Sequence, residues 1–335
     1  DKMLSDAERC IGSGKLSNAG DLYNRTFLDS SSLRVDAKER LESLATRIAN
    51  AYIKKGIEQA ESMRIDDSES TYHKVDEFLS RTSLEIDLSN LKTAIASAYA
   101  ARGKTLLRMG DPRLAESSYQ DALKWSEQTK GLDGLALGIS DYRVEEGIRY
   151  IEGGDVNSAE SSYSMARAIA KQRTKNMEKL AKLIVEHFIK EGIGKGGVDL
   201  TFIGDDVYSS VQSKAEEYGV GISLAPLGKA IVQAHIDNGI TLAQERDERG
   251  AEQSYIRALQ AQEKYSIELK KPLRQLANEI MKSFYDRIIM HIEGNDHFEA
   301  KNNLETAQRA AERMGIELPK KFEQLEEKVN ALLKT

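Results

Sequence analysis

A glycine followed sixteen residues later by a tyrosine recurs five times, and this fixed spacing constrains the fold more than any other feature of the sequence. The pairs are Gly56/Tyr72, Gly103/Tyr119, Gly147/Tyr163, Gly192/Tyr208 and Gly239/Tyr255. Degenerate copies, Ala7/Tyr23 and Ile288/Leu304, extend the series at both ends, and neighbouring copies lie 44 to 49 residues apart. A repeat of this length predicts about seven similar structural units that stack, because no single unit can bury its own apolar face.

The residues between these markers follow a helical period. In the segment 41–60 the apolar residues recur at steps of three and four, which places them on one face of a helix. Each unit therefore reads as a first helix that carries the glycine, a short turn near a Gly-Asp pair, and a second helix that carries the tyrosine. Asp111 precedes Pro112 as a natural N-cap, and proline is tolerated at the first helical position.

The order of these residues resembles the tetratricopeptide repeat. The best-matching unit has a ring, a glycine, an aliphatic residue, a turn glycine, an alanine, a tyrosine and a second alanine: Tyr99, Gly103, Leu106, Gly110, Ala115, Tyr119 and Ala122. The resemblance covers nearly the whole chain and implies an all-α fold, a right-handed α-α superhelix of about seven helical hairpins. The units are longer than the standard ~34 residues, and most lack the closing proline.

The resemblance and the register together predict two segments. Residues 1–318 form the tetratricopeptide-like array, and residues 319–335 form a C-terminal capping helix with an apolar face and a polar face. Short stretches such as Leu84–Leu88 alternate apolar and polar residues. We expect them to be extended linkers between units, because isolated three-residue strands do not form a stable sheet.

Composition excludes several classes of function. The formal net charge is −6 and the pI is about 5.6, so a nucleic-acid partner is not expected. No stretch approaches the roughly 18 apolar residues of a transmembrane helix, so we expect no membrane span. Cys10 is the only cysteine, which excludes a disulfide framework. The first residues lack the apolar core of a signal peptide, so the expected location is cytoplasmic.

We find no catalytic or cofactor motif. The glycine-rich segment 192–197 lacks the Ser or Thr that follows Gly-Lys in a P-loop, and we interpret it as the end of a first helix. The five histidines show no metal-ligand spacing. His235 stands at the ring position of its repeat, which favours a packing role. No enzyme activity, cofactor or metal is therefore expected.

The resemblance implies a non-enzymatic scaffold or adaptor that binds a partner peptide or amphipathic helix in a concave groove lined by the first helices. A second copy of the chain is a further candidate partner. The expected groove residues are Ile53, Ile57, Lys104, Val144, Ile148, Ile189, Ile193, Ile236, Ile240, Tyr285 and Ile289. Only Lys104 is charged, so a clamp for acidic C-termini is not supported, and the apolar majority predicts a hydrophobic groove.

Two alternatives stay open. The apolar residues of the expected groove are equally consistent with burial against one another between long helices. The chain also lacks an initiator methionine, which modestly favours the sensor or regulatory repeat domain of a larger regulator whose effector part is absent from this chain.

Overall fold

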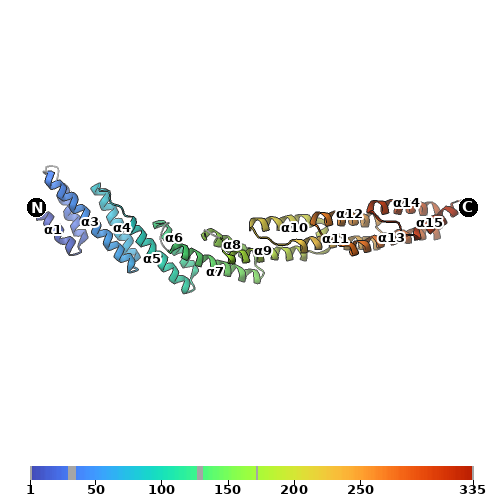
Figure 1. Ribbon diagram of the computed structural model, residues 1–335, viewed down its shortest axis with the longest axis horizontal. Coiled ribbons are helices and arrows are strands. Elements are labelled where there is room, and N and C mark those ends of the chain that lie inside the picture. Colours follow the sequence, from blue (N-terminus) through green and yellow to red (C-terminus); the bar gives the residue numbers. More distant parts are fainter. Residues whose placement is uncertain (1, 29–34, 127–130, 171–172, 334–335) are drawn as a thin grey trace. The chain divides into compact units, whose positions relative to one another are not determined.

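The computed structural model describes residues 2–28, 35–126, 131–170 and 173–333, and over these ranges the chain forms fifteen α-helices and no strand (Figure 1). Fourteen of the helices are consecutive pairs, so the expected all-α array of seven helical hairpins is confirmed. By its internal contacts the chain divides into two compact units. Unit 1 comprises residues 1–147 and 161–177, and unit 2 comprises residues 148–160 and 178–335.

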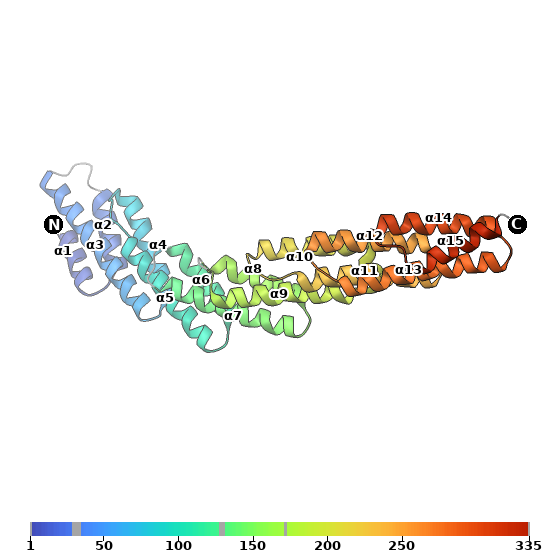
Figure 2. The ribbon, with the colours of Figure 1, turned by 45° about the vertical axis from the view of Figure 1, so that its right-hand side comes forward.

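We call the first helix of each hairpin helix A and the second helix B. The hairpins are α1 (Lys2–Gly12) and α2 (Leu16–Leu28), α3 (Val35–Glu61) and α4 (Ile65–Thr82), α5 (Ser89–Arg108) and α6 (Pro112–Trp125), α7 (Leu132–Glu152) and α8 (Val156–Ile169), α9 (Lys175–Gly194) and α10 (Gly197–Glu217), α11 (Ala225–Gln244) and α12 (Glu248–Tyr265), and α13 (Lys270–Glu293) and α14 (His297–Met314). The last helix, α15 (Lys321–Leu332), follows α14 as a single helix outside the seven hairpins. In unit 2, α12 and α14 lie in one row and α11 and α13 in another (Figure 2).

The turns between helices A and B form as the sequence predicts. Gly110 adopts a φ of 81°, a left-handed conformation that costs glycine little, and it ends α5. Asp111 then accepts a hydrogen bond from the Leu114 amide at 3.0 Å and begins α6, with Pro112 as its first residue. Asp155, Asp247 and Asp296 cap their helices in the same way.

The repeated tyrosines of helix B lie mostly in the core. Tyr23, Tyr119, Tyr163 and Tyr255 are buried. Tyr72 and Tyr208 are half-buried instead, and each packs its ring against an aromatic side chain of the next helix B. The ring centroids are 4.9 Å apart for Tyr72 and Trp125, and 4.3 Å apart for Tyr208 and Tyr265.

The glycine of helix A accommodates a side chain of the next hairpin. A Cβ atom built on Gly103 would lie 2.6 Å from Leu135 Cδ2, on the following helix A, but 3.3 Å from the Ala115 carbonyl oxygen on helix B. Gly56 and Gly239 show the same relationship to Leu91 and Leu276. Each of these three glycines also lies close to helix B of its own hairpin. Their closest neighbour is a leucine of the next unit, so they also set the stacking of hairpins.

In the described structure, extended segments join the hairpins, and a last helix follows α14. In the linker 84–88, Leu84, Ile86 and Leu88 turn inward while Glu85 and Asp87 are exposed, as the alternation predicts. The helix α15 buries Phe322, Leu325 and Val329 on one face, where it packs on α13 and α14.

Candidate functional site

The expected groove residues differ widely in exposure. Within the described ranges, Lys104 and Ile193 are exposed. Three of the others are buried and belong to the core: Val144, Ile189 and Ile236. The remaining six are half-buried: Ile53, Ile57, Ile148, Ile240, Tyr285 and Ile289. Val144, Ile189 and Ile236 are thus covered by neighbouring helices and cannot line an open groove. Only the exposed and half-buried residues remain available to a partner.

In unit 2 two of these residues come from helices that pack on each other. Ile240 lies on α11 and Ile289 on α13, both half-buried. Tyr285, also on α13, is covered in part by the last helix. Its ring centroid is 5.9 Å from that of Phe322, and the Lys321 ammonium lies 4.2 Å from the centre of the Tyr285 ring. The apolar surface of α13 is therefore partly occupied by α15.

A row of carboxylates on helix B was missed in the sequence interpretation. An acidic residue stands three positions before the tyrosine in five consecutive repeats: Glu69, Glu116, Glu160, Asp205 and Glu252. In the structure every one of them bonds to a side chain of the following hairpin. The signal was visible in the repeat register, but acidic residues on helices are usually solvated, so the spacing alone did not distinguish a structural role.

In unit 1 the row begins at Glu69 on α4. Its Oε1 atom accepts hydrogen bonds from the Tyr99 hydroxyl at 2.9 Å and from the Trp125 indole nitrogen at 3.0 Å. Burial raises the pKa of Tyr99, and the bond to Glu69 raises it further. The next carboxylate, Glu116, accepts a hydrogen bond from the Arg143 guanidinium at 2.6 Å. Each carboxylate thus joins two consecutive hairpins.

In unit 2 the carboxylates at the same repeat position make the same kind of contact with the following hairpin. Glu160 accepts the Tyr218 hydroxyl at 2.5 Å and pairs with Lys214. Asp205 accepts the Tyr265 hydroxyl, which lowers the pKa of Asp205, and Lys264 Nζ lies 2.9 Å from its Oδ2 atom.

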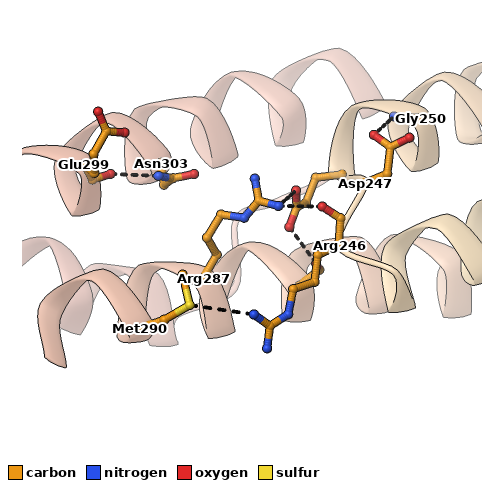
Figure 3. A network of polar contacts seen from close by, with 9 residues as sticks. Arg246, Asp247, Gly250, Arg287, Met290, Glu299 and Asn303 are labelled. Atoms are coloured by element: carbon orange, nitrogen blue, oxygen red, sulfur yellow. Dashed lines mark hydrogen bonds and ion pairs between the residues drawn. The ribbon is translucent and has the colours of Figure 1, made fainter. Parts of the chain in front are cut away.

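Glu248 is a buried carboxylate outside this row, and it joins α12 to α13. It accepts the Ser283 hydroxyl at 2.7 Å and the Arg287 guanidinium at 2.8 Å. Arg287 also donates to the Arg246 carbonyl oxygen at 2.5 Å, as Figure 3 shows, so it ties the α11–α12 turn to α13. These contacts join neighbouring helices of unit 2.

A cavity of about 390 Å³ opens between α10, α11 and α12 in unit 2. Its lining includes Phe202, which is 74% exposed, and His235, which is 8% exposed. Arg257 and Lys264 contribute positive charge. Burial lowers the pKa of His235, and the charge of Arg257 lowers it further, although Asp205 opposes the shift. The imidazole is therefore neutral near pH 7.

A wider depression of about 840 Å³ adjoins this cavity along α12, and Gln260 lines both. Ile256 and Leu259 from α12 line it, together with Ile267 of the following linker and Arg313 of α14. Arg313 is already paired with Glu252.

The glycine-rich segment forms the turn in which α9 ends at Gly194 and α10 begins at Gly197, as interpreted from the sequence. Among the residues that the structure describes, no three His, Cys, Asp or Glu side chains cluster so that they could hold a metal ion. No described helix is long and apolar enough to cross a membrane.

No family model and no curated protein sequence matches the chain. Among solved structures, the crystal structure of the tetratricopeptide domain of P58(IPK) is similar over 99% of this chain and 98% of its own, with 14% identity and a TM-score of 0.22. The apo form of RapI is similar over 99% of this chain and 86% of its own, with 13% identity and a TM-score of 0.16. Both TM-scores are far below 0.5, so neither likeness supports a conclusion about function. The chain's own seven hairpins and their repeated register give it an all-α fold of stacked helical hairpins like that of tetratricopeptide repeats.

Proposed function

We propose that this chain is a non-enzymatic interaction scaffold that binds a peptide or amphipathic helix of a protein partner along its A helices. The observation that carries the proposal is the pair of half-buried isoleucines on adjacent A helices of unit 2, Ile240 on α11 and Ile289 on α13. Apolar side chains that stay partly exposed on neighbouring helices are a common basis for binding a helix, whose own apolar residues recur at three- and four-residue steps.

The proposed surface continues at residues of the sequence-based set. Ile193 near the end of α9 is 37% exposed and extends the apolar surface of unit 2. In unit 1 the corresponding surface consists of Ile53 and Ile57 on α3 and of Lys104 on α5. Because Lys104 is the only charged member, we expect the partner segment to be mainly apolar rather than acidic.

The test replaces the two carrying residues together. Ile240→Lys with Ile289→Lys places two charges on the proposed surface without changing any fully buried side chain. We expect affinity capture followed by mass spectrometry to lose the partner that the unchanged chain retains. The matched control is Leu259→Lys on α12, a side chain that is 38% exposed on a B helix and lies outside the proposed surface.

The melting transition separates the outcomes. If the double variant keeps its helical circular dichroism and its melting temperature but loses the partner, the A-helix surface binds it. If the double variant unfolds, these isoleucines are needed for the core. If it folds and captures the same partner with unchanged affinity, while Leu259→Lys loses it, the binding surface lies on the B helices.

A further inference from the structure

The cavity between α10, α11 and α12 lies beside a ring position that carries a histidine. The residue four positions before the glycine of helix A is Tyr52, Tyr99 or Phe188 in three other repeats, but His235 in this one. In the α5 repeat the Tyr99 hydroxyl reaches Glu69, the carboxylate of the preceding helix B. Asp205 is the corresponding carboxylate in this repeat. It accepts a hydrogen bond from Tyr265 and pairs with Lys264, both on the following helix B. His235 thus carries a smaller ring at a position where those three repeats carry a larger one.

The charged groups that line this space carry a net positive charge. Asp205 already accepts from Tyr265 and pairs with Lys264, so its charge is balanced. The Arg257 guanidinium forms no ion pair with any residue that the structure describes, and it leaves the cavity with one net positive charge.

His235 adds a neutral donor. Its Nδ1 atom is buried and has no hydrogen-bond partner among the described residues. An N–H group left without a partner in such a place would lose its hydrogen bond to water, so the proton belongs on the other nitrogen. His235 lines the cavity, so we infer that its Nε2–H is the donor available there.

The remaining walls are apolar. Leu200 and Ile231 are almost fully buried at the base of the cavity, and the Phe202 ring is 74% exposed at its rim. A volume of about 390 Å³ falls within the range of small-molecule sites. We propose that this cavity binds a small organic carboxylate, whose single negative charge meets Arg257 and the His235 Nε2–H group and whose apolar body rests on Ile231 and Phe202. This site is independent of the protein-binding surface proposed above.

The probe is 4-fluorobenzoate, with the uncharged 4-fluorobenzamide as its counterpart. A fluorine NMR titration of the full chain should show saturable binding of the carboxylate in the millimolar range or tighter, and binding of the amide at least about ten-fold weaker. Arg257→Gln should weaken carboxylate binding by about ten-fold, because it removes the charge but keeps most of the side chain. His235→Phe should abolish binding, since it fills the cavity and removes the donor.

The control is Arg249→Gln, an exposed arginine on the same helix α12 that does not line the cavity. It should leave the affinity unchanged, and all variants should keep the melting temperature within a few degrees of the unchanged chain or above it. Three results overturn the proposal. They are the absence of saturable carboxylate binding, equal binding of the amide, or equal losses in Arg249→Gln and Arg257→Gln.

Discussion

The carboxylate of Glu252 accepts two hydrogen bonds from Arg313, a residue 61 positions further along the chain on the next helix B. Arg313 Nε lies 2.5 Å from Oε1, and its Nη2 atom lies 2.9 Å from Oε2. The Glu252 side chain is only 5% exposed, whereas that of Arg313 is 56% exposed. The pair thus joins α12 to α14 through one buried and one accessible partner.

This asymmetry gives the first prediction. Arg313→Met should lower the free energy of unfolding by about 1–3 kcal/mol, because it leaves a buried carboxylate without its charged donor. Adding Glu252→Gln should recover part of this loss, since no unpaired buried charge remains. Urea unfolding of the unchanged chain, of Arg313→Met, of Glu252→Gln and of the double variant measures both effects. A double variant that loses as much as the two single variants combined would show that the two residues do not interact.

The second prediction concerns the glycine of helix A. Gly103→Ala should cost about 1–3 kcal/mol, because its Cβ would lie 2.6 Å from Leu135 Cδ2 in a packed core. Gly20→Ala is the matched control, because no heavy atom lies within 4 Å of the position of its Cβ. In that helix alanine should stabilise the protein by about 0.5–1 kcal/mol. Equal urea midpoints for the two variants would contradict the packing of Leu135 on Gly103.

The third prediction concerns the tyrosine of helix B. Tyr119 is 7% exposed, and Tyr119→Ala should cost about 3–5 kcal/mol through the cavity that it leaves. Tyr150→Ala is the comparison, because Tyr150 is 38% exposed and should lose far less stability. Thermal unfolding followed by circular dichroism distinguishes the two. Similar losses would mean that the repeat register does not separate core from surface.

Much of the fold followed from the sequence because its signals are local or strictly periodic. Gly110 and Asp111 predicted a turn and a helix start, and both formed where expected. The contacts between hairpins were harder to foresee, because they join residues far apart in sequence. One signal was available but unused, a leucine twelve positions before the glycine position of helix A in six repeats: Leu44, Leu91, Leu135, Leu180, Leu227 and Leu276.

The candidate site was less predictable than the fold. Helical periodicity gave two apolar faces on helix A, but it cannot tell which face another helix covers. Ile236 and Ile240 are four residues apart on α11, yet the first is fully buried and the second only half-buried. The cavity beside His235 depends on three helices, and in the sequence only a histidine at the ring position marks its place.

The last prediction concerns the pH dependence that His235 gives to stability. Burial first, and the charge of Arg257 second, lower the pKa of His235 from its ordinary value of 6.5. As the pH falls below about 6.5, the unfolded chain therefore takes up a proton that the folded protein still excludes. The free energy of unfolding falls over this window until the folded-state pKa is reached.

His235→Phe removes this titration and restores a ring like that of Phe188 in the preceding repeat. Its stability relative to the unchanged chain should therefore increase when the pH is lowered from about 7.5 to about 5.5, whatever the two stabilities are at neutral pH. Urea unfolding of both proteins at several pH values gives this difference directly, since the other titrating groups are common to both. A difference that stays constant across the range would mean that His235 binds its proton equally well in the folded and unfolded chain, contrary to its burial between the helices.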